Sequence, residues 1–315
     1  MQLLQMLRDS VNVELYTRHL SRLEAKAREL SGTIKSFVSE NGLPLIITYS
    51  STGFLPASLT YWFTLVMFED KYPIRADFPT VTYQLLVYRP QDPIVGYAPS
   101  VTASVINALR TATLLGNKMV VLTGEIQDPR LDQLLRNYRV VSAGSNVFET
   151  ALIQAMSSFH AMADLSRDKL SRRGARLLEH SVEGFAPVAK DLVEKYVEIV
   201  EWIASRKKLS IISTEIMECG AQYTGEVLST LGIEAVNQRP GSRPLHDAVL
   251  LISTTVEDLY LRELESDIKK TGIDVRELVF NTDPLEANVY LSLLAYYLYF
   301  LKKMLSGGVS EPASR

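Results

Sequence analysis

The sequence predicts an α/β fold built from two parallel sheets, each covered by helices on both faces. Continuous apolar runs such as LIITYS (45–50) alternate with runs whose apolar residues have helical spacing. A strand that is apolar at every position must be buried on both faces, which indicates a parallel sheet made of right-handed βαβ units. The alternation stops at the basic segment DKLSRRGAR (168–176) and then restarts, which favours two tandem, doubly wound, three-layer units.

The first half has strands and helices in regular alternation. The predicted strands are 45–50, 72–79, 93–98, 119–125 and 138–144, and the predicted helices are 54–70, 81–88, 101–116, 129–137 and a long helix from Val147. We expect residues 1–172 to form an N-terminal helix and the first unit.

The second half repeats the pattern after a helix over 188–205. The predicted strands are 208–215, 233–240, 247–255 and 274–281, and the predicted helices are 217–231, 256–271 and 286–305. We expect residues 173–315 to form the second unit, with a C-terminal helix and a mobile tail, SGGVSEPASR.

Composition narrows the class of protein. With 47% hydrophobic and 22% charged residues and a net charge of -3, the chain reads as a soluble globular protein without a nucleic-acid partner. The single cysteine excludes an internal disulfide, and no apolar run is long enough for a membrane span, so we expect a cytoplasmic protein. No His, Asp and Glu have metal-ligand spacing, and YSSTGF lacks the glycines of a dinucleotide-binding turn, so we expect neither a metal nor a cofactor.

Two turns rich in hydroxyl groups follow strands of the first half. Ser50, Ser51 and Thr52 lie between the strand at 45–50 and the next helix, and Ser100 and Thr102 follow the strand at 93–98. Ligands of open parallel sheets bind at the carboxyl ends of the strands, and free N–H groups of a helix N-terminus attract phosphate. The alternative is that these serines and threonines merely cap the helices.

These turns carry a resemblance to a known family. The doubled unit, the two turns, the segment SAGSNVFET and the closing helix PLEANVYLSLLAYYLYFLKK resemble the double sugar isomerase (SIS) domain proteins over about residues 40–305. The resemblance implies a phosphorylated sugar as ligand, held by the five hydroxyl residues of the two turns. It also implies a homodimer. The aromatic run YLSLLAYYLYFL and the helix that contains His160 are candidates for the dimer surface, with a plain core role as the alternative.

The resemblance also implies a histidine and a glutamate that move protons in the second unit. His246 matches the family histidine before a strand, whereas Thr230 stands where the glutamate is expected and Glu226 lies one turn earlier. The phosphate loop is altered too, with Ser100 where the family has glycine. His246 could instead donate to a carbonyl at the start of its strand, and Glu226 could be a solvated helix residue.

Two functions therefore remain open. The chain could be a sugar-phosphate isomerase or amino-sugar-phosphate deaminase, with His246 and Glu226 as catalytic residues. It could also be a noncatalytic sugar-phosphate sensor or structural protein that kept the fold.

Overall fold

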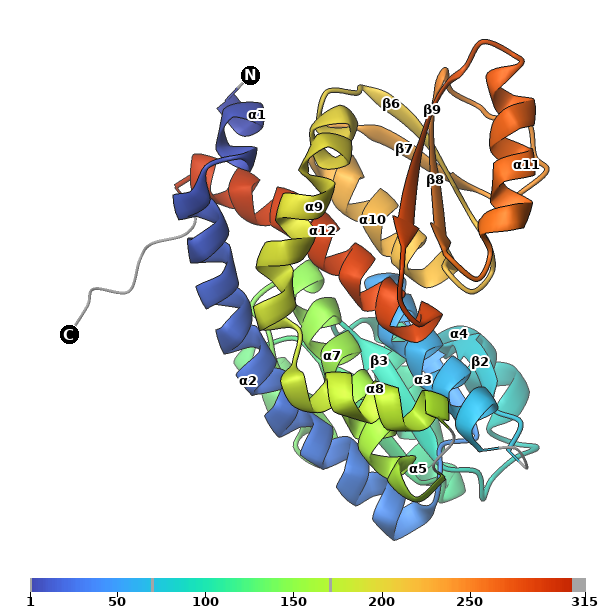
Figure 1. The fold of residues 1–315 in the computed structure, drawn as a ribbon. Helices are drawn as coiled ribbons and strands as arrows, with labels where there is room; N and C mark the ends of the chain where they lie inside the picture. Colours follow the sequence, from blue (N-terminus) through green and yellow to red (C-terminus); the bar gives the residue numbers. More distant parts are fainter. Residues whose placement is uncertain (1, 69–70, 170–171, 308–315) are drawn as a thin grey trace. The chain divides into compact units, whose positions relative to one another are not determined.

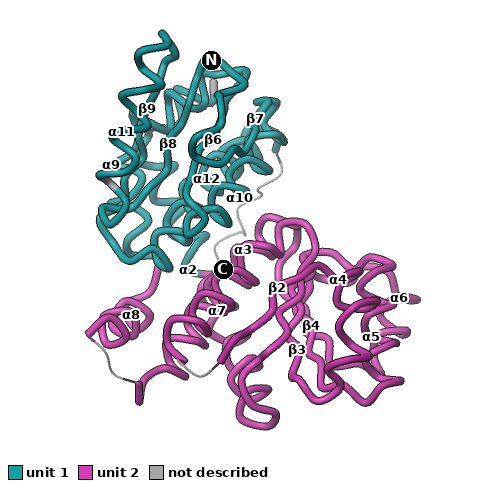
Figure 2. The backbone as a smooth tube through the Cα atoms, turned by 90° about the vertical axis from the view of Figure 1, so that its right-hand side faces the viewer, with its two compact units in different colours: residues 1–21, 186–315 teal, residues 22–185 magenta. Residues whose placement is uncertain are grey.

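The computed structural model describes residues 2–68, 71–169 and 172–307, so most of the expected mobile tail lies outside the described residues. The chain forms two compact units, which Figure 2 distinguishes by colour: unit 1 comprises residues 1–21 and 186–315, and unit 2 comprises residues 22–185. This division differs from the boundary expected at residue 172, because α8 (Arg172–Glu183) packs on α7 (Val147–Leu165) of unit 2. No helix within the described ranges has the length and apolar character needed to cross a membrane.

Unit 2 contains a five-stranded parallel sheet with the strand order β2-β1-β3-β4-β5. Its strands are β1 (Ile46–Tyr49), β2 (Ile74–Asp77), β3 (Ile94–Ala98), β4 (Met119–Thr123) and β5 (Val140–Ser142). Its other elements are η1 (Ser51–Gly53), α3 (Phe54–Met67), α4 (Phe78–Thr80), η2 (Val81–Leu85), α5 (Ala103–Leu115), α6 (Pro129–Leu135), α7, η3 (Arg167–Lys169) and α8. Every residue of β3 and β4 is buried, as the continuous apolar runs predict.

Helices cover both faces of this sheet. Side chains of η2, α5 and α6 pack with Ile46, Ile94 and Val121 in one core cluster. On the other face, α3 contacts β1 and β3, and α7 contacts both α3 and β3. The three-layer arrangement predicted for the first half is confirmed.

Unit 1 repeats this architecture with a four-stranded parallel sheet in the order β7-β6-β8-β9, the same order as the first four strands of unit 2. Its elements are α1 (Gln2–Leu7), the start of α2 (Ser10–Asn41), α9 (Ala186–Ala204), β6 (Lys208–Ser213), α10 (Glu218–Thr230), β7 (Glu234–Gln238), β8 (Ala248–Thr254), α11 (Asp258–Lys269), β9 (Asp274–Phe280) and α12 (Pro284–Leu305). Figure 1 shows α11 on one face of the sheet and α10 and α12 on the other.

The two segments considered for a dimer surface are buried within the chain. Tyr296 and Tyr297 of α12 pack against Tyr16, and both are almost fully buried. His160 of α7 is 4% exposed, and its Nδ1 lies 2.9 Å from the hydroxyl of Ser181. The core alternative therefore holds for both segments, and the homodimer stays a prediction without an assigned surface.

Candidate functional site

The carboxyl ends of β1 and β3 form the point where the strand order of unit 2 reverses. From β1 the chain passes to β2 on one side, whereas from β3 it passes to β4 on the other, and open parallel sheets bind ligands near such a reversal. The N–H of Ser50 donates to the carbonyl of Tyr97 at 3.0 Å, which joins the turn after β1 to the end of β3. The two hydroxyl-rich turns predicted from the sequence are therefore neighbours.

Glycines allow the backbone segments of this edge to pack closely. A Cβ atom on Gly53 would lie 2.3 Å from the carbonyl oxygen of Tyr97, and one on Gly124 would lie 2.6 Å from that of Pro99. Both distances are far below van der Waals contact, so only glycine fits at these positions. Ser51, with φ at 47°, is the one residue other than glycine in the left-handed region among those described. Packing thus holds Ser51, in the turn after β1, in a left-handed backbone conformation that is unfavourable for serine.

The N-cap residues of the two turns, Ser50 and Thr102, do not cap their helices with their hydroxyl groups. Ser50 and Thr102 occupy N-cap positions, yet neither side chain makes a capping hydrogen bond. Thr102 Oγ1 lies 2.8 Å from Ser104 Oγ, and Thr52 Oγ1 donates to the carbonyl of Val147 at 3.4 Å. The capping alternative is therefore wrong for Ser50 and Thr102.

The start of α7, by contrast, is fully capped. The side-chain oxygen of Asn146 accepts from the N–H of Glu149 at 3.1 Å, and the Glu149 carboxylate accepts from the N–H of Ser145 at 3.0 Å. This reciprocal pair is a variant of the capping box, in which the glutamate accepts from the residue before the N-cap. The Glu149 carboxylate also offsets the positive end of the α7 dipole, so an anion is better placed at the uncapped start of α5.

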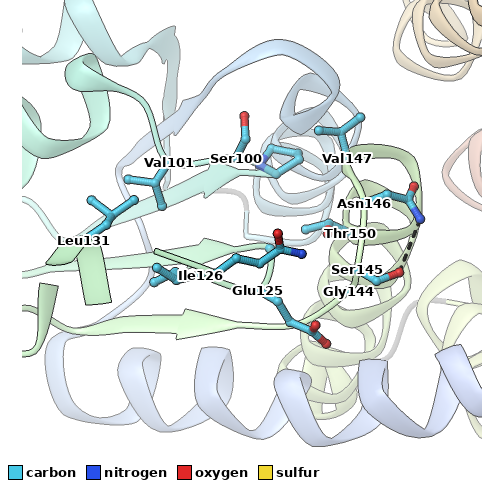
Figure 3. A pocket seen from close by; sticks show the side chains of 13 residues that line it. Ser100, Val101, Glu125, Ile126, Leu131, Gly144, Ser145, Asn146, Val147 and Thr150 are labelled. Carbon is cyan, nitrogen blue, oxygen red and sulfur yellow. Dashed lines mark hydrogen bonds between the residues drawn. The ribbon is translucent and has the colours of Figure 1, made fainter. Parts of the chain in front are cut away.

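A cavity of about 280 Å³ opens at this edge of the sheet. Figure 3 shows Val101, Ile126 and Leu131 on one side, Ser145–Val147 at the start of α7 on the other, and Ser100 and Glu125 between them. The lining residues are Pro99, Ser100, Val101, Gly124, Glu125, Ile126, Gln127, Leu131, Gly144, Ser145, Asn146, Val147 and Thr150.

Three buried hydroxyl groups without hydrogen-bond partners lie at this edge of the sheet, and one of them, that of Thr150, belongs to the cavity wall. Ser50 Oγ after β1, Thr123 Oγ1 at the end of β4 and Thr150 Oγ1 in the first turn of α7 are buried and have no partner among the residues described. Leaving a buried polar group unsatisfied costs about 1–3 kcal/mol, and each such group in a folded protein calls for an explanation. A polar ligand or ordered water at this edge of the sheet would satisfy them.

The side chain of Tyr97, near the carboxyl end of β3, makes hydrogen bonds with the two helices that cover one face of the sheet. Its buried hydroxyl accepts a hydrogen bond from Ser158 Oγ of α7 at 2.8 Å and lies 2.6 Å from Thr60 Oγ1 of α3. Burial raises the pKa of Tyr97 to about 12, and the bonds to Ser158 and Thr60 oppose this shift. The neutral phenol thus links the carboxyl end of β3 to α3 and α7.

Glu125 is the only ionisable side chain among the residues that line the cavity. It is about half exposed, and its carboxylate lies 3.9 Å from Lys26 Nζ of α2. No cationic side chain is among the described residues that line the cavity, so an anion bound there would depend on hydroxyl and backbone N–H groups.

The predicted binding residues and the predicted catalytic residues belong to different units. Ser100 lines the cavity, and Ser50, Ser51, Thr52 and Thr102 belong to the adjoining turns, all in unit 2. His246 and Glu226 belong to unit 1.

His246 lies at the amino end of β8, opposite the sheet edge where parallel sheets bind ligands. Its backbone N–H donates to Ser210 Oγ at 3.1 Å, and its Nε2 lies 3.9 Å from the Glu234 carboxylate. Glu226 lies in the middle of α10 and accepts from Gln222 Nε2 at 3.2 Å. The catalytic roles of His246 and Glu226 stay predictions.

Sequence reasoning missed the part of the cavity wall that follows β4 and β5. Gly124, Glu125, Asn146 and Thr150 line the cavity but were not among the candidates. A signal was present, because SAGSNVFET contains glycine, hydroxyl residues and the N-x-x-E spacing of a cap.

Comparisons with known proteins bear on the fold. No protein-family model matches the sequence, and no curated protein matches it either. Among solved structures, the chain is similar to tagatose-6-phosphate ketose/aldose isomerase from Escherichia coli, with 11% identity and a TM-score of 0.59 over 97% of this chain and 94% of that one.

Two further structures are similar over comparable lengths. Glucosamine-6-phosphate deaminase from Thermotoga maritima has 10% identity and a TM-score of 0.58, covering 91% of this chain and 95% of that one. The C-terminal domain of glucosamine-fructose-6-phosphate aminotransferase from Francisella tularensis has 14% identity and a TM-score of 0.58, covering 94% and 97%. The predicted resemblance to the double SIS proteins is thus confirmed at the level of the fold.

Proposed function

We propose that this chain binds a phosphorylated sugar at the carboxyl edge of the unit 2 sheet. The observation that carries this proposal is a cavity at the carboxyl ends of β3, β4 and β5 with the buried, unpartnered hydroxyl of Thr150 on its wall, while Ser50 and Thr123 at the same edge of the sheet also have buried, unpartnered hydroxyls. Several hydroxyl-bearing contacts in one crevice suit a polyol. Support also comes from similar folds that act on sugar phosphates, as the names of their structures state.

The phosphate group would lie at the turns after β1 and β3. The start of α5 has no side-chain cap, so its first N–H groups and the positive end of its dipole face this edge. Ser50, Ser51, Thr52, Ser100 and Thr102 supply the hydroxyls. The sugar ring would then extend toward Gln127, Ser145 and Asn146 across the cavity.

The second candidate function is turnover of that sugar phosphate, as an isomerase or an amino-sugar-phosphate deaminase. Either reaction needs a base within hydrogen-bond reach of a sugar carbon-bound proton. Glu125 favours this candidate, because it is a carboxylate on the cavity wall itself. A noncatalytic sugar-phosphate sensor is the alternative if Glu125 only orients a hydroxyl group.

Thermal-shift measurements test the binding function. A ligand that binds only the native state raises its stability. The panel is fructose 6-phosphate, glucose 6-phosphate, mannose 6-phosphate and glucosamine 6-phosphate, with inorganic phosphate and the unphosphorylated sugars as controls. We expect one sugar phosphate to raise the Tm well above the shift seen with phosphate. Equal Tm values with all of them would contradict the proposal.

Turnover assays with the best ligand of that panel then separate the two candidates. If the chain is an enzyme, Glu125→Gln should lower kcat by at least about a hundredfold while the ligand still raises the Tm, because the substitution removes a base but keeps a hydrogen-bonding group. Glu263→Gln, an exposed position on α11 of unit 1, is the matched control. Absence of turnover by the wild type would leave the sensor as the function.

A further inference from the structure

Unit 1 has a cavity of its own at the carboxyl edge of its sheet. It measures about 500 Å³ and is separate from the site in unit 2. The residues that line it are Ser213, Thr214, Glu215, Glu218, Asn237, Gln238, Arg239, Pro240 and Tyr260. They come from the end of β6, the start of α10, the end of β7 and the start of α11. Carboxyl ends of parallel strands again supply the walls.

Charges of both signs line this cavity without pairing. Glu215, Glu218 and Arg239 make neither an ion pair nor a side-chain hydrogen bond with any described residue. Elsewhere in unit 1, Arg8 binds Glu201 at 2.6 Å and Lys208 binds Glu234 at 2.8 Å, so partners form where the geometry allows them. The carboxylates of Glu215 and Glu218 and the guanidinium of Arg239 thus line one cavity without a partner among the described residues.

Two uncharged groups complete the wall. Ser213, the last residue of β6, is 9% exposed, and its hydroxyl has no hydrogen-bond partner within the described part of the chain. Tyr260 of α11 is 52% exposed and presents an aromatic ring. The first turn of α10 is already occupied, because the side-chain oxygen of Asn288 accepts from the N–H of Gly220 at 2.9 Å. Recognition of an anionic group therefore falls to Arg239.

We infer that the unit 1 cavity binds a small zwitterion, with its ammonium group at Glu215 and Glu218 and its anionic group at Arg239. Charge-assisted hydrogen bonds of both signs would then form in one site, and Arg239 could hold a carboxylate or phosphate through two parallel N–H bonds. An amino-sugar phosphate and a free α-amino acid share this chemistry. The site goes beyond the proposed function, since it lies in the other unit and selects for an amine.

Isothermal titration calorimetry tests the inference with glucosamine 6-phosphate, glucose 6-phosphate and L-serine as probes. All titrations use the full chain, as wild type and as Ser50→Ala/Ser100→Ala, which weakens the unit 2 site. Binding of an amine-bearing probe that persists in this double variant reports on the unit 1 cavity. Glucosamine 6-phosphate alone would identify an amino-sugar phosphate as the ligand, and L-serine alone an amino acid.

Substitutions in the unit 1 cavity complete the test. Glu215→Gln/Glu218→Gln should raise the Kd of the amine-bearing probe by at least about tenfold, and Arg239→Ala should do the same. Arg243→Ala and Glu263→Gln, exposed residues outside the lining, should leave the Kd unchanged. The inference is overturned if both cavity variants keep the wild-type Kd. It is also overturned if neither amine-bearing probe binds the double variant at concentrations up to about 10 mM.

Discussion

Ser50 and Ser100 occupy neighbouring turns at the ends of β1 and β3, and neither hydroxyl caps a helix. If they hold a phosphate, the variant Ser50→Ala/Ser100→Ala should bind the sugar phosphate at least about a hundredfold more weakly. Each lost hydrogen bond to a charged group removes about 1.5–3 kcal/mol, and the double variant loses two. Calorimetry measures the Kd, and Ser266→Ala, an exposed serine of α11, is the control. An unchanged Kd in the double variant would show that the anion binds elsewhere.

Tyr97 makes the free energy of unfolding depend on pH in the alkaline range. Its pKa of about 12 in the native state exceeds the usual value of 10.0, so the unfolded chain loses the phenol proton first. The stability that Tyr97 contributes is complete below pH 10 and is lost as the pH rises toward 12, by roughly 3 kcal/mol.

The variant Tyr97→Phe tests this dependence. It should lose about 1 kcal/mol at pH 7, because Thr60 and Ser158 keep their bonds to Pro56 and Gln154. Above pH 10 its unfolding free energy should fall less steeply than that of the wild type. Urea denaturation between pH 8 and 11 measures both slopes, and parallel curves would refute the assignment.

At the scale of single residues, the sequence predicted the position of the two hydroxyl-rich turns, one of which contributes Ser100 to the cavity wall. Hydroxyl residues after a buried strand signalled Ser50 and Ser100, because strand ends can be recognised from local hydrophobicity. The sequence did not predict that Glu125 and Thr150 line the cavity, because their positions depend on how β4 and β5 align with β3. Only the folded sheet fixes that alignment.

Close contacts between elements depend on glycine at the edge of the unit 2 sheet. Gly53→Ala would place a methyl group 2.3 Å from the carbonyl oxygen of Tyr97, so η1 must move away from β3. We expect a loss of about 1–3 kcal/mol and weaker sugar-phosphate binding. Gly32→Ala is the control, because nothing lies within 4 Å of its added methyl in α2. The control should gain up to about 1 kcal/mol. Equal Tm values for both variants would contradict the close packing.

The start of α7 depends on its capping box. Asn146→Ala removes the acceptor for the N–H of Glu149 and should cost about 1 kcal/mol. Chemical denaturation measures this loss. Asn146→Asp should keep most of the stability, since aspartate caps as well as asparagine does. A destabilisation of equal size in both variants would point to another role for the side chain.

Element order was predictable, whereas the grouping of helices was not. The expected strands match the observed ones, because the central strands β1, β3, β4, β6 and β8 are short, apolar runs bounded by turn residues. The assignment of α8 to unit 2 could not be read from composition, since its charged sequence suggests a linker. Buried contacts explain its place: Arg28 Nη2 of α2 donates to the carbonyl of Ser181 at 3.0 Å.

At the scale of the whole molecule, the two units share a strand order but differ in what lines their carboxyl edges. Unit 2 presents hydroxyls and one carboxylate, Glu125, whereas unit 1 presents Arg239 with Glu215 and Glu218. The internal repeat of the sequence predicted the shared fold. The linings differ because they come from turns that the internal repeat does not constrain, so two cavities with different linings could not be predicted from the repeat.

The central claim is that a phosphorylated sugar lies at the carboxyl edge of the unit 2 sheet. A crystal structure of the full chain with the sugar phosphate that gives the largest thermal shift tests it most directly. We predict phosphate density within hydrogen-bond distance of the turns that contain Ser50 and Ser100, with the sugar ring against Asn146. Phosphate density at the amino edge of either sheet, or in the unit 1 cavity alone, would contradict the claim.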